Sequence, residues 1–123
     1  MAESIAFDAQ VALEDGDLVR ADERAYAAMV AGARALVRTE HPNVPDDRDT
    51  IVREFKERFY DTERFFDRFA KGRFARPLFD RHESAPERHE EEATRVLVEE
   101  AQLFIDAVHA MEIREAGAQS ALV

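Results

Sequence analysis

Cysteine is absent from this sequence of 123 residues. Its absence excludes disulfide bonds, thiolate zinc sites and cysteine nucleophiles. Uncharged runs are short, and the one near the middle, 25–33, is far below the roughly 20 residues that a membrane-spanning helix requires. The acidic start, MAESIAFDA, lacks the basic residues and the apolar run of a signal peptide. We therefore expect a cytoplasmic protein that does not associate with a membrane.

Glycine and proline are also scarce, at four residues each, and neither alternating β-branched residues nor Asn-Gly turns occur. The apolar residues instead recur at three- and four-residue steps, as in amphipathic helices. The length suits one domain that buries about two-thirds of its unfolded surface. The sequence predicts an all-α fold: an up-and-down bundle of four or five helices in a single domain, 1–123, with an ordered core over about 4–116 and a tail at 117–123.

The net charge of −10 argues against a protein whose main task is to bind a phosphate backbone. Residues 55–82 differ from the rest, because they contain seven of the nine phenylalanines and 64–82 carries a net charge of +4. In one interpretation the phenylalanines form the core, and the arginines cover it and pair with the acidic stretch 83–100. In the other, the cations form a surface for an anionic ligand or partner. That surface would consist of Arg64, Arg68, Lys71, Arg73, Arg76 and Arg81.

The first two helices have clear boundaries in the sequence. We expect one helix over 4–14 and the next over 18–39, since Gly16 is a stop signal and Asp17 a good N-cap. The two prolines within 41–45 then break the chain. Seven alanines and one glycine give the second helix a smooth face, which suits close approach of another helix, either inside the bundle or across a dimer axis.

The boundaries of the later helices are less sharply marked. An aspartate within 46–49 caps the third helix, which either continues to Lys71 or breaks at 61–62. Gly72 ends whichever helix precedes it, and Pro77 fits the first turn of a short helix that follows.

The last helix is expected to begin at a capping box. Ser84 would accept a backbone hydrogen bond while Glu87 reaches back, and Pro86 would lie in the first turn. The apolar stripe carries this helix to about residue 115, where Gly117 would stop it. At about 45 Å long, such a helix would project from the bundle or pair with a partner.

Motifs for metal or nucleophilic chemistry are missing. Of the four histidines, only His109, with Asp106, approaches the Glu-x-x-His spacing of di-iron bundles, and it stands alone. His82 and His89 lack the spacing of zinc ligands. There is no serine–histidine–acid set and no glycine-rich phosphate loop. We expect neither a metal nor a cofactor.

The order of these signals nevertheless carries a family resemblance. The residues concerned are ALEDGD at 12–17, AYAAM at 25–29, ARAL at 33–36, Phe55-x3-Phe-Tyr-Asp-Thr62 and EEAQLFI at 99–105. In this order they resemble the HEPN family of small helical bundles, over about residues 5–110. Many members of that family dimerise, so the resemblance implies a homodimer.

Some HEPN proteins are metal-independent ribonucleases with an Arg-x4–6-His motif at the dimer cleft, and Arg76 and His82 match that motif. Under this alternative, His82 would act as general acid or base for attack by a ribose 2′-hydroxyl, and Arg76 would stabilise the phosphorane charge. Pro77 occupies a position where catalytic members prefer a small polar residue, which favours a non-catalytic accessory protein. A purely structural dimerisation module is the third interpretation.

A second resemblance concerns 59–75, which is similar to helical accessory domains associated with bacterial nitrite and sulfite reductases. It implies that the basic loop around Lys71, Arg73 and Arg76 faces a partner enzyme or an oxyanion. The partners to expect are thus a reductase or, for a toxin-type HEPN pair, a nucleotidyltransferase. RNA would be a partner only under the ribonuclease alternative.

Overall fold

The computed structural model describes residues 1–65 and 72–122, with side chains as far as Glu115. Helices, turns and loops make up all of these residues, which confirms the predicted all-α helical fold. The helices in chain order are α1 (Ala2–Glu14), α2 (Leu18–Arg38), α3 (Arg48–Phe55), a π-helical turn (Lys56–Tyr60), a 3-10 turn (Arg73–Ala75), α4 (Arg76–Glu83) and α5 (Glu91–Leu122).

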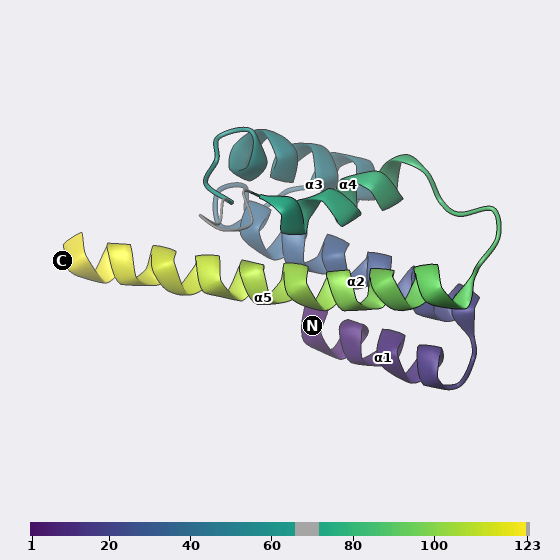
Figure 1. Cartoon of the computed structure of the whole chain (residues 1–123). Helices are drawn as coiled ribbons and strands as arrows, with labels where there is room; N and C mark the ends of the chain where they lie inside the picture. Colours follow the sequence, from purple (N-terminus) through teal and green to yellow (C-terminus); the bar gives the residue numbers. More distant parts are fainter. Residues whose placement is uncertain (66–71, 123) are drawn as a thin grey trace.

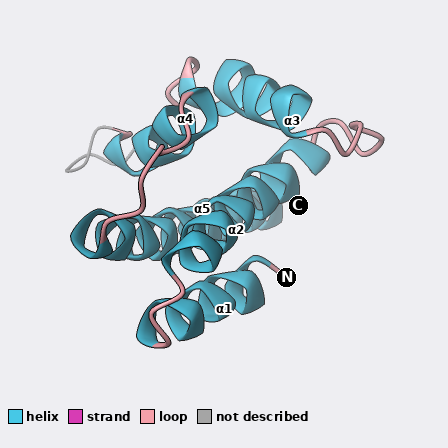
Figure 2. Cartoon of the chain, turned by 90° about the vertical axis from the view of Figure 1, so that its right-hand side faces the viewer, coloured by secondary structure: helices cyan, strands magenta, loops and turns pink. Residues whose placement is uncertain are grey.

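The long helices α2 and α5 lie side by side at the centre of the bundle (Figure 1). Figure 2 shows α1 on one side of this pair and α3 with α4 on the other, so that the helices form three layers. The C-terminal end of α5 extends beyond the other helices (Figure 1), as its predicted length implied.

The connection between α2 and α3 returns along α2 instead of continuing past its end. Arg34 of α2 pairs with Asp46 of this connection at 2.8 Å, and Arg48, the first residue of α3, pairs with Glu23 near the start of α2 at 2.9 Å. Helix α3 therefore runs in the same direction as α2. Consecutive helices are antiparallel, as in the predicted up-and-down order, from α1 to α2 and from α3 through α4 to α5. The parallel pair α2 and α3 interrupts this order.

The predicted caps at the first two connections are confirmed. Gly16 adopts a positive φ of 79°, which an L-residue with a side chain rarely adopts. Asp17 then accepts a hydrogen bond from the backbone N–H of Arg20 at 3.1 Å. Asp47 caps α3 in the same way by accepting from the N–H of Thr50 at 3.0 Å.

Aromatic rings fill the centre of the core, as predicted for the phenylalanine-rich stretch. Phe55, at the end of α3, packs edge-on against Phe65 at 5.3 Å and against Phe104 of α5 at 5.6 Å between ring centroids. Phe59 is also buried, whereas Phe79 is only partly buried. The predicted core residues Phe66 and Phe69 lie outside the described residues.

At Gly32, the small residues of α2 allow another helix to pack closely inside the bundle. A Cβ built on Gly32 would lie 3.5 Å from Val108 and 3.6 Å from the ring of Phe104, so the side chains of α5 rest directly on the backbone of α2. Ala35, almost one helical turn further along α2, is exposed instead. The smooth face is therefore only partly covered within one chain.

Of the two alternatives for the third helix, the structure has the break at 61–62. The helix widens into the π-helical turn after Phe55, and the chain then turns over 61–63, where Glu63 has a positive φ of 60°. Gly72 has a positive φ of 76° and precedes the 3-10 turn, and Pro77 lies in the first turn of α4 as predicted.

Two predicted boundaries of the last helix are wrong. Ser84 does not start it: Ser84 is in extended conformation as the C-cap of α4, and residues 84–90 form a loop that lets the chain reverse before α5. Gly117 does not stop it either, because α5 continues to Leu122. A glycine inside a helix costs only about 1 kcal/mol, so Gly117 by itself is too weak a signal to end α5.

Candidate functional site

A group of polar side chains lies where α2, α3 and α4 meet; Asp22 and Tyr26 are buried, Arg81 and His82 are partly buried, and Asp49 is exposed. It consists of Asp22 and Tyr26 from α2, Asp49 from α3, and Arg81 and His82 from α4. We call these five residues the polar junction. Asp22 and Tyr26 lie one turn apart on α2, so both side chains face α4. The chain thus brings together residues that are more than 50 positions apart.

Asp22 and Arg81 form the first half of the polar junction. The guanidinium group donates through Nε and Nη2 to the carboxylate, with distances of 3.1 Å and 2.8 Å to Oδ2. His89 in the loop before α5 places its Nε2 3.7 Å from the same oxygen. A two-point contact of this kind holds both charges in one geometry.

Tyr26 and His82 form the second half. The phenol oxygen of Tyr26 lies 2.6 Å from Nδ1 of His82, and Nε2 of His82 lies 2.8 Å from Oδ1 of Asp49. A neutral imidazole satisfies this network if the phenol donates to Nδ1 and the Nε2 proton is donated to Asp49. Both ring nitrogens of His82 are therefore engaged.

Two guanidinium groups also lie over the ring of Tyr26. Arg48 lies 4.8 Å from its centroid and Arg81 lies 4.5 Å from it. Burial raises the pKa of Tyr26 above its usual range, so the phenol stays neutral at physiological pH. These contacts give the polar junction a structural role in joining α2, α3 and α4.

The described cations of the predicted basic surface do not gather in one place. Arg64 pairs with Glu40 after α2 and with Glu115 of α5 at 3.4 Å, and its guanidinium lies 4.5 Å from the ring of Phe59. Arg81 belongs to the polar junction near the start of α2. These two side chains cover the core and hold carboxylates, as the first interpretation expects, but their partners lie outside the acidic stretch 83–100 that it named.

The remaining predicted cations are on the surface or outside the described residues. Arg73 and Arg76 are exposed at the 3-10 turn and the first residue of α4, and neither forms an ion pair with a described carboxylate. Arg68 and Lys71 lie outside the described residues. Anion binding by the segment therefore stays a prediction, and in the described part of the chain it rests on Arg73 and Arg76.

The structure does not bring Arg76 and His82 together within one chain. They are six residues apart on α4, which corresponds to a rise of about 9 Å and a rotation of about 240° around the helix axis. Arg76 is exposed, whereas His82 points into the polar junction. A shared site would need a second chain.

Within the described ranges, no group of three or more His, Asp or Glu side chains is arranged to hold a metal ion. His109 pairs with Glu3 of α1. In the same part of the chain, every helix is too short or too polar to cross a membrane.

Sequence reasoning missed the polar junction. One signal was available. Asp22 interrupts the apolar stripe of α2, with Leu18 before it and Ala25 and Met29 after it, at a position where the helical period requires a buried residue. A carboxylate there needs a buried cation. Nothing in the local sequence indicates that this cation is Arg81.

Comparisons of this chain with protein families, with curated proteins and with solved structures find no match. The resemblance to HEPN proteins therefore remains a prediction from the residues quoted above, and the functional conclusion depends on the site itself.

Proposed function

We propose that this chain is a non-catalytic, HEPN-like accessory protein that binds an anionic ligand or a partner protein through Arg73 and Arg76. The observation that carries the proposal is the exposure of both side chains: Arg73 begins the 3-10 turn and Arg76, three residues later, begins α4, a spacing that places side chains on one side of a 3-10 turn. Two exposed cations close together attract an anion in an otherwise acidic protein.

The contacts of His82 and Arg81 support a non-catalytic role. His82 uses both ring nitrogens inside the polar junction, and Arg81 is held by Asp22. A general base needs a free nitrogen within hydrogen-bond reach of its substrate. In this arrangement His82 stabilises the fold.

A charge-reversal experiment tests the basic surface. We expect the double variant Arg73→Glu/Arg76→Glu to lose binding to sulfite, sulfate, phosphate or nucleotides in a thermal-shift screen, or to a purified sulfite or nitrite reductase in a pull-down. Arg20→Glu/Arg53→Glu changes two other exposed arginines by the same charge and should retain that binding. Equal behaviour of the two double variants, or no binding by the unmodified protein, contradicts the proposal.

The homodimer is part of the same proposal. Large apolar side chains on the surface support it: Phe7 of α1 is 63% exposed, Leu103 of α5 is 45% exposed and Ile113 of α5 is 72% exposed. Light scattering at two protein concentrations measures the mass directly. A monomer at both concentrations would remove the dimer and leave the anion surface unaffected.

The ribonuclease is a second candidate, favoured only by the presence of Arg76 and His82 on one helix. Its test is cleavage of single-stranded RNA in EDTA, with His82→Ala as the control. Cleavage that disappears in this variant would replace the accessory function; cleavage that persists comes from a contaminant.

A further inference from the structure

The outer face of α5 carries apolar residues that the bundle does not cover. They follow one another at steps of seven residues: Val96, Leu103, Ala110 and Gly117. Seven residues fall only about 20° short of two full turns, so these residues share one side of the helix. Val96 is 41% and Leu103 is 45% exposed, and Ala110 and Gly117 are exposed as well.

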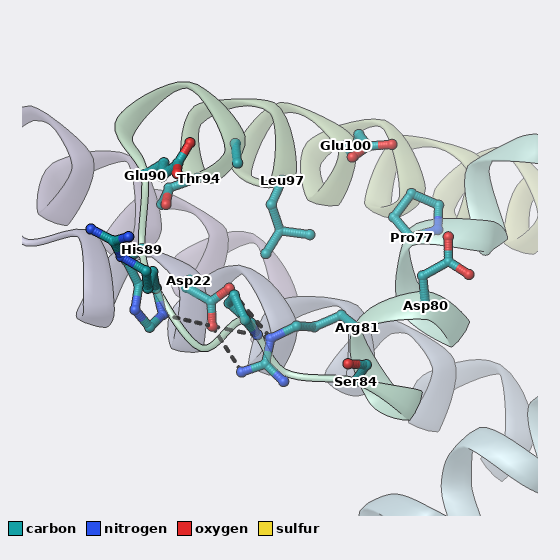
Figure 3. A pocket seen from close by; sticks show the side chains of 13 residues that line it. Asp22, Pro77, Asp80, Arg81, Ser84, His89, Glu90, Thr94, Leu97 and Glu100 are labelled. Carbon is teal, nitrogen blue, oxygen red and sulfur yellow. Dashed lines mark hydrogen bonds and ion pairs between the residues drawn. The ribbon is translucent and has the colours of Figure 1, made fainter.

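This outer face points away from the core of the bundle. Val108 is buried and lies two residues before Ala110, which is a rotation of about 200° around the helix axis. On the side toward α4, Leu97 lines the cavity between α4, the loop 84–90 and α5 (Figure 3). Figure 1 shows α5 in front of α2, with its outer face turned away from the other described helices.

Charged residues on the outer face are separated by sign along α5. Glu99 and Asp106 lie in its first half, Arg114 lies in the projecting end, and all three are exposed. Their positions around the helix fall within or next to the apolar stripe. Within the described residues, neither Glu99 nor Arg114 forms an ion pair. A partner that covers this face should therefore present a cation opposite Glu99 and a carboxylate opposite Arg114.

A second copy of α5 that runs in the opposite direction meets this requirement. If the two-fold axis passes between Asp106 and Ala107, Glu99 lies opposite the partner's Arg114, because the two positions are equally far from the axis. The symmetry repeats this pair on the other side, so that each copy supplies one cation and one carboxylate.

The sizes of the apolar residues are complementary in the same arrangement. Leu103 lies opposite the partner's Ala110, and Val96 lies opposite the partner's Gly117, so each larger side chain meets a small residue. Ile113, which is 72% exposed, follows Ala110 by three residues and therefore adjoins the partner's Leu103. Small residues opposite large ones allow the two helices to approach closely.

The projecting end of α5 acquires contacts in an antiparallel pair. Residues 112–117 of one copy lie opposite 96–101 of the other, where α5 is backed by its own bundle (Figure 1). A parallel pair would instead place Glu99 beside the partner's Glu99 and Arg114 beside the partner's Arg114. Such like charges oppose association, so the charges favour the antiparallel arrangement.

We propose that two copies of this chain associate through the outer faces of their α5 helices, packed antiparallel about a two-fold axis between Asp106 and Ala107. This interface rests on the homodimer of the proposed function, which it specifies in residues. It does not involve Arg73 or Arg76, so it is independent of the proposed anion surface.

Cysteine cross-linking tests the arrangement, because the chain has no cysteine of its own. When Leu103→Cys and Ala110→Cys chains are mixed, equilibrated and oxidised, we expect a mixed disulfide-linked dimer. Neither variant should cross-link to itself, since two copies of one position are about 10 Å apart along the helices, whereas a disulfide joins Cα atoms at most about 7 Å apart. A Leu103→Cys chain that cross-links chiefly to itself indicates a parallel pair and overturns the proposal.

A control mixture and light scattering separate this interface from the homodimer as such. Glu57→Cys, at an exposed position of the π-helical turn, mixed with Ala110→Cys measures cross-linking by random collision. A dimer of the unmodified chain without mixed cross-linking above this background removes the α5 interface and leaves the homodimer. A monomer at both protein concentrations removes both.

A charge exchange tests the ion pairs. Glu99→Arg and Arg114→Glu should each weaken the dimer about tenfold, and the double variant should recover an affinity within about threefold of the unmodified chain. Within one chain the two residues are about 22 Å apart along α5, so such a recovery arises only between chains. A double variant no tighter than either single variant overturns the antiparallel pairing.

Asp106 gives a separate prediction, because its two copies lie close together beside the axis. Asp106→Asn should tighten the dimer about threefold by removing this repulsion. Glu57→Gln removes the same charge away from α5 and should leave the affinity unchanged. Equal effects of the two variants contradict the position of the axis.

Discussion

Arg81 of α4 and Asp22 of α2 form a two-point ion pair across 59 positions of sequence, with only 14% and 5% of their side chains exposed. Because the pair is largely buried, each charge depends on the other for its solvation. The pair is also the half of the polar junction that lies beside Tyr26. It is therefore the polar contact on which the attachment of α4 to α2 chiefly depends.

Removal of one partner of this pair should destabilise the fold strongly. We expect Arg81→Met or Asp22→Ala to lower the free energy of unfolding by about 3 kcal/mol, since each leaves a buried charge unpaired. Urea denaturation measures the change. The double variant Asp22→Leu/Arg81→Met should recover much of this loss, because no lone charge remains.

An exposed ion pair provides the control for this prediction. Lys56 and Asp61 pair at 3.1 Å with about half of each side chain exposed, and Lys56→Met should change the free energy of unfolding by less than about 1 kcal/mol. Similar losses for Lys56→Met and Arg81→Met would show that burial is not the cause.

The phenol of Tyr26 should stabilise the protein through its hydrogen bond to His82. We expect Tyr26→Phe to cost about 1–2 kcal/mol, because Nδ1 of His82 then loses its donor. Thermal or urea unfolding at neutral pH checks this value. An unchanged stability would mean that solvent satisfies Nδ1.

The same phenol should make stability depend on alkaline pH. The pKa of Tyr26 is raised in the folded protein, so the fold favours the neutral phenol. This contribution is fully present below the ordinary tyrosine pKa of about 10 and is lost as the pH rises through the higher, folded value. The decline of stability with rising alkaline pH should be shallower in Tyr26→Phe than in the unmodified protein.

Two glycines should respond in opposite directions to substitution by alanine. Gly32→Ala places a methyl group at ordinary contact distance from Val108, and it should stabilise α2 by up to about 1 kcal/mol. Gly72→Ala should destabilise by about 1–2 kcal/mol, since Gly72 has a positive φ and the new Cβ would lie 3.3 Å from the ring of Tyr60.

Glu63 offers a check on the backbone part of this argument. It has a positive φ of 60° without being a glycine, so Glu63→Gly should relieve strain and leave stability equal or higher. The melting temperatures of Gly32→Ala, Gly72→Ala and Glu63→Gly, measured under one set of conditions, test these three expectations. A stabilised Gly72→Ala protein would contradict the conformation described at that turn.

Phe104 should be among the most sensitive core positions. It is fully buried, packs against Phe55 and Phe65, and rests on Gly32, so Phe104→Ala should cost about 3–5 kcal/mol. Phe7→Ala removes an exposed ring of the same size and should change the stability of the isolated chain little. Comparable losses would mean that Phe7 is covered in solution, as in a dimer.

The sequence by itself determined the elements whose signals are local. Helical periodicity and the lack of strand patterns determined the all-α class, and Gly16, Asp17 and the prolines of 41–45 determined the first two connections. Caps and turns of this kind involve atoms within a few residues of one another. The phenylalanine spacing likewise predicted the buried rings of Phe55 and Phe59.

Only the tertiary structure decided which polar groups meet. Asp22 pairs with Arg81 and Tyr26 with His82 because α4 packs against α2, and no local rule connects residues nearly 60 positions apart. The same packing overrides the local signal at Ser84, which caps the end of α4 because the chain must reverse before α5. Contacts between helices depend on the free energy of the whole bundle, and a short sequence motif contains too little of that energy to predict them.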